Sequence, residues 1–132
     1  MYIRTAKDLL SWIANHRRVV GIDASILATS ANVSPKFISQ LENGKESLEV
    51  DSLVKVARAL GLNIPLLFNP ELMGRLVKEK RQELGLDQIT GAALCNVSPR
   101  FLSTIENGKP KKRLNKLFDV LNGFGIVIEV LN

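Results

Sequence analysis

A short segment occurs twice in this chain, and this repeat limits the fold more than any other feature of the sequence. Residues 33–45 and 97–109 share the pattern Val-Ser-Pro-x-Phe-x-Ser-x-x-Glu-Asn-Gly-Lys. The alignment continues without a gap between residues 10–68 and residues 74–132, so that each residue matches the one 64 positions further on. Such a period indicates two copies of one structural unit. We therefore expect two tandem domains, residues 1–68 and 69–132.

The repeated segment carries the signals of a short helix. Ser34 and Ser98 are suited to cap a helix N-terminus, and the proline that follows each is tolerated at the first helical position. Gly44 and Gly108 are expected to end each helix after about ten residues. Apolar residues form one stripe, so the polar side chains point outward. Those outward residues are of the kinds that hydrogen-bond base edges in DNA: Lys36, Ser39 and Gln40 in the first copy, and Arg100, Ser103 and Thr104 in the second.

Capping residues and apolar spacing predict the remaining helices. Asp23 and Asp87 each precede a segment that is expected to be helical and to end at Asn32 or Asn96, since asparagine tolerates the left-handed conformation. A first helix is expected from Thr5 to about Arg18, and its apolar face is expected to consist of Leu9, Leu10, Ile13 and Val20. The other expected helices cover residues 69–84, 50–60 and 114–124.

Each copy is expected to end in one β-strand. Residues 126–131 are rich in β-branched side chains, and residues 62–68 are their equivalent in the first copy. Pro65 lacks a backbone N–H, so the first of these segments is expected to be an edge strand. A lone strand is unstable, and the nearest partner is the equivalent strand of the other copy. We therefore expect residues 62–68 and 126–131 to form an antiparallel ribbon within one chain.

Composition narrows the classes of function. The 132 residues carry a formal net charge of +5 with a pI near 9.6, which favours a polyanionic partner. No apolar run is long enough to cross a membrane, no leader peptide precedes the first helix, and one cysteine cannot form an internal disulfide, so a cytoplasmic protein is expected. A lone histidine and isolated serines predict no metal, no cofactor and no catalytic site, so an enzyme is the least supported class.

The two capped helices in each copy, joined through Asn-Val-Ser, resemble the lambda-repressor-like (XRE) family of helix-turn-helix proteins. The resemblance implies an all-α fold of two tandem helix-turn-helix bundles, each ending in a short strand that pairs with the other. It also implies that Gln88 contacts a DNA phosphate, a role that Ala24 cannot take in the first copy. Leu27 fits the family pattern, whereas the second copy has Gly91 at that position. The buried ion pair of the family, which joins the first helix to the recognition helix, has its counterparts in Arg17 with Glu42 and in Arg81 with Glu106.

More narrowly, the second copy is similar to HipB-type antitoxins. This similarity rests on the segments Arg-Phe-Leu-Ser at 100–103, Gly-Lys-Pro at 108–110, the basic run 111–113 and Gly-Ile-Val-Ile at 125–128. It implies a toxin as a partner protein and a strand that pairs across a dimer. The sequence leaves open whether two chains pair further.

We interpret the chain as a sequence-specific DNA-binding transcriptional regulator that acts as a fused pseudo-dimer, with a HipB-like antitoxin autorepressor as the narrower hypothesis. The alternative is a protein-interaction module that binds a partner protein and little DNA. Because the outward residues differ between the copies, the two DNA half-sites are expected to differ as well. The residues expected to bind DNA are Ser34, Lys36, Ser39, Gln40, Asn43, Lys45, Gln88, Ser98, Arg100, Ser103, Thr104, Asn107, Lys109, Lys111, Lys112 and Arg113.

Overall fold

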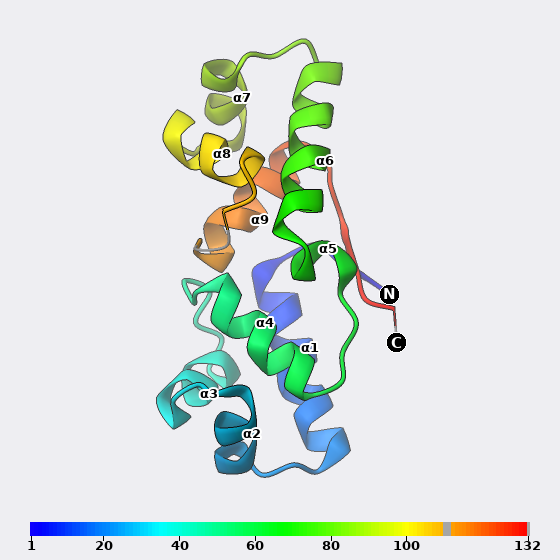
Figure 1. Cartoon of the computed structure of the whole chain (residues 1–132), viewed down its shortest axis with the longest axis vertical. Helices are drawn as coiled ribbons and strands as arrows, with labels where there is room; N and C mark the ends of the chain where they lie inside the picture. Colours follow the sequence, from blue (N-terminus) through cyan, green and yellow to red (C-terminus); the bar gives the residue numbers. More distant parts are fainter. Residues whose placement is uncertain (110–111, 132) are drawn as a thin grey trace.

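The computed structural model describes residues 1–109 and 112–131. These residues form nine helices and two strands of two residues each. The helices are arranged in two bundles stacked along the long axis of the molecule, with the N- and C-termini together at its middle (Figure 1). Among the described residues, no helix is both long and apolar enough to cross a lipid bilayer.

The first bundle is built from helices whose ends follow the predicted capping residues. Thr5 caps the first helix by accepting from the Asp8 N–H, and Asp23 caps the second by accepting from the Ser25 N–H. Val20 closes the first helix but is 56% exposed, so it does not belong to the apolar face that the sequence predicted. The helices are α1 (Ala6–Val20), α2 (Ala24–Ala31), α3 (Pro35–Glu42), α4 (Val50–Ala59) and the single turn α5 (Pro65–Phe68).

The second bundle repeats this arrangement. Asn69 caps its first helix by accepting from the Leu72 N–H, and the left-handed Asn32 and Asn96, with φ of 56° and 57°, form equivalent turns in the two bundles. Each of these turns is the tight connection of a helix-turn-helix. The helices are α6 (Pro70–Glu83), α7 (Gln88–Cys95), α8 (Pro99–Glu106) and α9 (Leu114–Gly123).

The predicted ribbon between the ends of the two copies is wrong. Residues 65–68 form the helical turn α5, because Pro65 occupies the first helical position and the Phe68 N–H donates to the Ile64 carbonyl at 3.0 Å. Strand β2 (Ile128–Glu129) instead pairs antiparallel with β1 (Tyr2–Ile3) at the N-terminus. The first copy also contacts the last residues of the chain near α5, since the Leu131 N–H donates to the Asn63 carbonyl at 2.9 Å.

The two copies also meet at a short antiparallel bridge between Glu49 and Arg113, which are equivalent residues of the repeat. The Val50 N–H donates to the Lys112 carbonyl, and the Leu114 N–H donates to the Leu48 carbonyl, both at 2.9 Å. Exchanging the copies converts each of these bonds into the other, because positions 50 and 114, and positions 48 and 112, are 64 residues apart. A local two-fold axis therefore passes between Glu49 and Arg113.

Candidate nucleic-acid interface

Helices α3 and α8 begin with the same local structure. The Ser34 hydroxyl accepts from the Phe37 N–H and the Ser98 hydroxyl accepts from the Phe101 N–H, each at 3.0 Å. Each helix is eight residues long and is followed by an asparagine and a left-handed glycine, so the helices are slightly shorter than predicted. Their apolar stripes are buried: Ile38 and Leu41 in α3, and Leu102 and Ile105 in α8.

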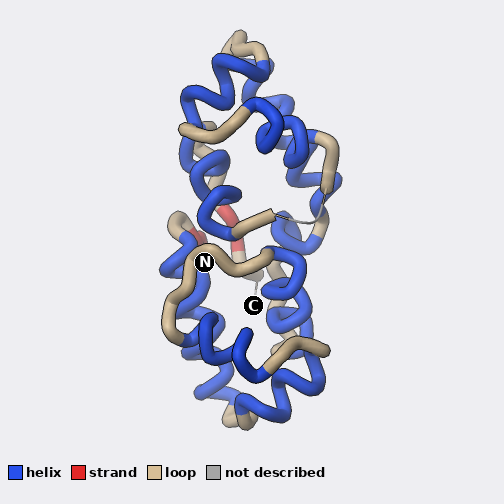
Figure 2. Tube along the Cα trace, turned by 90° about the vertical axis from the view of Figure 1, so that its left-hand side faces the viewer, coloured by secondary structure: helices blue, strands red, loops and turns tan. Residues whose placement is uncertain are grey.

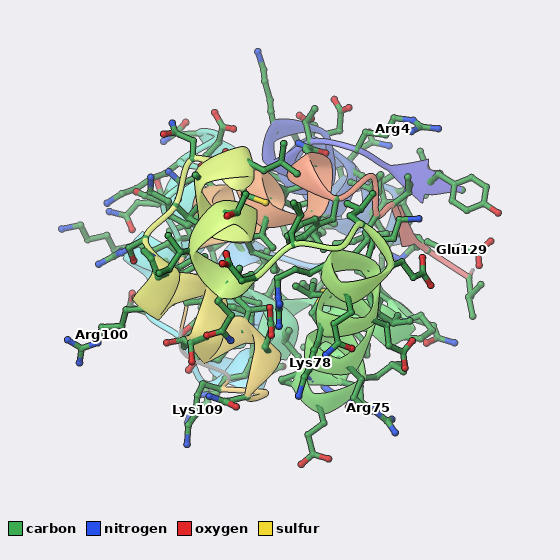
Figure 3. All side chains as sticks on the ribbon, turned by 90° about the horizontal axis from the view of Figure 1, so that it is seen from above. Arg4, Arg75, Lys78, Arg100, Lys109 and Glu129 are labelled. Carbon is green, nitrogen blue, oxygen red and sulfur yellow. The ribbon has the colours of Figure 1, made fainter. Side chains whose placement is uncertain are left out.

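Both helices lie on the same long side of the molecule. Figure 1 shows α3 and α8 on the side opposite the two termini, and Figure 2 views this side directly. Seen along the long axis, Arg100 points outward on this side, away from Arg4 and Glu129 near the terminal strands (Figure 3). A single ligand that runs along the molecule would therefore meet both helices.

Most of the predicted binding residues on or beside these helices are accessible. Gln40, Ser103 and Thr104 are half-buried, and the other side chains in this group are exposed. The exposed residues are Ser34, Lys36, Ser39, Asn43 and Lys45 in the first copy, and Ser98, Arg100, Asn107 and Lys109 in the second.

Part of this surface is identical in the two copies, and part differs. The Asn107 side-chain amide donates to the Ser103 hydroxyl at 3.3 Å, and Asn43 makes the equivalent bond to Ser39 at 3.5 Å. The differences lie at two matched positions, since Lys36 corresponds to Arg100 and Gln40 corresponds to Thr104. These four residues are the ones that could distinguish two half-sites.

An ion pair ties each of these helices to the first helix of its bundle, as the family resemblance implied. Arg81 donates to both carboxylate oxygens of Glu106, at 2.7 and 2.8 Å, and its remaining arm donates to the Leu86 carbonyl at 2.8 Å. Arg17 makes the same bonds to Glu42 and to the Ile22 carbonyl. The side chains of the second pair are only 9% and 3% exposed, whereas both side chains of the first pair are 18% exposed.

Two substitutions between the copies account for this difference in burial. Gln88 covers the second pair, because its side-chain amide donates to Glu106 at 3.2 Å, whereas the first copy has Ala24 there. Gly91 makes room for the arginine, since a Cβ at that position would lie 2.9 Å from the Arg81 Cδ atom. Burial raises the pKa of Glu106, but the hydrogen bonds from Arg81 and Gln88 outweigh it and leave this pKa below its ordinary value.

The cations of the basic run after α8 lie in different environments. Lys109 and Arg113 are exposed, as is Lys116 at the start of α9, whereas Lys111 lies outside the described residues. Lys112 is only 6% exposed, because it occupies the position at which the first copy has the core residue Leu48. Its ammonium donates to the Lys109 carbonyl at 3.0 Å, and burial lowers its pKa. In this structure Lys112 therefore belongs to the junction between the copies, and the accessible cations of the run lie on either side of it.

Two cations on α6 were not among the residues that the sequence predicted to bind DNA. Arg75 and Lys78 are exposed and point to the side of the second bundle that also carries Lys109 (Figure 3). Arg75 borders a hollow of about 310 Å³ whose other lining residues are Glu71, Glu106, Asn107 and Gly108. The three-residue spacing of Arg75 and Lys78 on an amphipathic helix could have indicated a common exposed face.

The described residues hold no group of three or more His, Cys, Asp or Glu side chains arranged to bind a metal ion. The accessible residues on and beside α3 and α8 supply hydrogen-bonding side chains, helix N-termini and lysine or arginine cations. This chemistry suits contacts to phosphates and base edges.

Two similarities to known proteins agree with this geometry. The sequence model of a helix-turn-helix family matches residues 21–67 and 77–131. The chain is also 36% identical over 62 residues to a protein of Sinorhizobium fredii described as "Uncharacterized HTH-type transcriptional regulator y4mF". That match covers 47% of this chain and 82% of the relative.

Proposed function

The chain belongs to the helix-turn-helix family, and from this premise we propose that it is a transcriptional regulator that binds specific DNA sequences as a covalent pseudo-dimer. The observation that carries the proposal is the position of α3 and α8, which lie on one side of the molecule and belong to copies related by a local two-fold axis. Dimeric helix-turn-helix proteins place two such helices in successive major grooves. Here one chain supplies both. The family is not a family of enzymes, in agreement with the prediction from sequence.

In the proposed complex, the N-terminal halves of α3 and α8 face base edges. Arg100 has the planar donor pair that matches guanine O6 and N7, and Gln40 can donate to and accept from adenine. Lys45, Lys109 and Gln88 are assigned to phosphates, together with the first N–H groups of the helices. The cations Arg75 and Lys78 extend this phosphate-binding surface along α6.

The two half-sites are proposed to contribute unequally. Arg100 offers a two-bond contact, whereas Lys36 at the equivalent position offers a single point charge. The second copy also has Gln88 and exposed cations after α8, whereas the first copy has Ala24 and the acidic Glu46 and Glu49. We therefore assign the stronger half-site to α8.

Replacing Arg100 by alanine tests this assignment. Loss of a two-bond base contact is expected to cost about 1–3 kcal/mol of binding free energy and to relax selectivity at one base pair. Lys109→Ala is the control, since a phosphate contact weakens binding to all sequences alike. Titration of both variants against single-base operator variants measures the difference. Uniform loss of affinity in Arg100→Ala would assign Arg100 to a phosphate instead.

A second candidate function is supported by exposed apolar side chains at both ends of the molecule. They are Val19, Val20 and Ile26 at one end, and Leu84, Ile89 and Leu94 at the other, with exposed fractions between 51% and 76%. Exposed apolar side chains that form a contiguous patch are typical of protein-binding surfaces. They favour an interaction with a partner protein, of which a HipB-like antitoxin role is the narrower form. DNA binding that weakens steeply with salt supports the first function, because counterions are released from phosphates; weak binding without such a slope supports the second.

A further inference from the structure

The junction between the copies lies at a defined point of the proposed interface. Figure 1 shows the start of α9 and the loop before α4 meeting on the side that carries α3 and α8, midway along the molecule. The local two-fold axis passes between Glu49 and Arg113 at this junction. If the copies bind related half-sites, this axis coincides with the centre of the operator. Residues on the axis then face the central base pairs, which α3 and α8 do not reach.

The groove that faces the axis follows from the geometry of DNA. Two helices that enter major grooves on one face of the duplex are one helical turn apart. Halfway between them the duplex has turned by half a turn, so its minor groove faces the protein. An arginine at this point meets the strong negative potential of a minor groove, which is most pronounced where A·T base pairs narrow it.

Arg113 has the position and the freedom to make this contact. Its side chain is 58% exposed. One arm of the guanidinium donates to the Ser47 carbonyl at 2.8 Å, and another lies 3.8 Å from the Glu49 carboxylate, which is itself 41% exposed. Exposed ion pairs contribute little to stability, so the guanidinium can leave Glu49 at small cost.

Of the two equivalent positions that form the bridge, only position 113 carries a cation. The residue equivalent to Arg113 in the first copy is Glu49, and Glu46 and Asp51 are close to it in the sequence. These carboxylates are repelled by phosphates and cannot enter a negative groove. The basic group at the centre therefore comes from the second copy alone.

We propose that Arg113 enters the minor groove at the operator centre and makes binding depend on base pairs between the two half-sites, with a preference for a narrow, A·T-rich centre. The inference rests on the proposed DNA-binding function and extends it, because it assigns specificity to base pairs that no recognition helix touches. The shape of the groove is recognised in this contact, and no individual base is identified.

The test uses the full chain and an operator selected with it from random DNA. Its central base pairs are replaced by A·T, G·C or inosine·cytosine pairs, while both half-sites are kept. Inosine·cytosine lacks the guanine amino group in the minor groove but otherwise resembles G·C, so it separates minor-groove from major-groove effects. We expect A·T and inosine·cytosine centres to bind on the order of tenfold more tightly than G·C.

Two variants complete the test. Arg113→Ala is expected to bind all three centres equally, whereas Lys116→Ala, which removes a nearby exposed cation, loses affinity for all centres alike and keeps the preference. Circular dichroism checks that both variants are folded, and the comparison of centres with the unaltered chain can still overturn the inference even if Arg113→Ala does not fold. Binding of inosine·cytosine like G·C, or a preference that persists in folded Arg113→Ala, would overturn the inference. Affinity that does not respond to mutation of the half-sites would overturn the proposed function as well.

Discussion

Arg81→Ala is expected to lower the free energy of unfolding by about 3–5 kcal/mol, because it leaves the Glu106 carboxylate buried without its cation. That carboxylate is 3% exposed and accepts two of its hydrogen bonds from Arg81. The same change removes the hydrogen bond from Arg81 to the Leu86 carbonyl, and this bond helps to hold the loop between α6 and α7. The effect should appear in denaturant unfolding followed by circular dichroism.

The repeat provides a matched control for this variant. Arg17→Ala removes the equivalent cation, but its partner Glu42 is 18% exposed and can be hydrated, so the loss should be clearly smaller. Equal losses in the two variants would show that burial does not set the strength of these pairs.

The dependence of the free energy of unfolding on pH, measured at acid pH, gives a second test of the ion pair between Arg81 and Glu106. The pKa of Glu106 in the folded protein is below its ordinary value of 4.5, so the stabilisation is complete above pH 4.5 and is lost as the pH falls through the lower folded-state value. Arg81→Ala should weaken this fall in stability, since it removes the main hydrogen-bond donor that keeps the pKa low.

Gly123→Ala is expected to destabilise the second bundle by about 2–3 kcal/mol through overpacking. A Cβ at this position of α9 would lie 2.4 Å from the Cys95 Sγ atom and 3.0 Å from the Cys95 Cα atom. The thiol cannot move away easily, because Cys95 is buried and its S–H points to the Val120 carbonyl at 3.7 Å.

The first copy shows how this clash can be relieved. The residues equivalent to Cys95 and Gly123 are Ala31 and Ala59. The first copy therefore has a smaller side chain where the second has Cys95, and a larger one where the second has Gly123. Cys95→Ala with Gly123→Ala should therefore recover most of the lost stability, and the alanine at 123 adds helix propensity of about 1 kcal/mol. A double-mutant cycle in urea measures the coupling. Simple additivity of the two single changes would contradict this account of the packing.

The sequence predicted best those features that depend on neighbouring residues. Ser34, Ser98, Asp23 and Asp87 cap helices as expected, because a cap is a bond between residues two or three positions apart. The family resemblance extended this to the two ion pairs, whose members recur together in both copies.

Features that depend on distant partners could not be derived in the same way. Residues 62–68 have the composition of a strand, but the partner of β2 is Tyr2–Ile3 at the other end of the chain, and Pro65 is equally suited to begin a helical turn. Lys112 looked like one more surface cation of a basic run. Its burial follows from the contact between the copies, where it occupies the position of Leu48.

The central claim is that one chain recognises two unequal half-sites, and selection of bound sequences from random DNA by the full chain tests it most directly. The bridge between Glu49 and Arg113 fixes the two bundles relative to each other, so the half-sites should have one constant spacing of about 34–36 Å, one turn of DNA. Because Lys36 and Gln40 stand where the second copy has Arg100 and Thr104, we predict an imperfect inverted repeat in which substitutions in the Arg100 half-site cost more. A perfect palindrome that is equally sensitive in both halves would contradict the account.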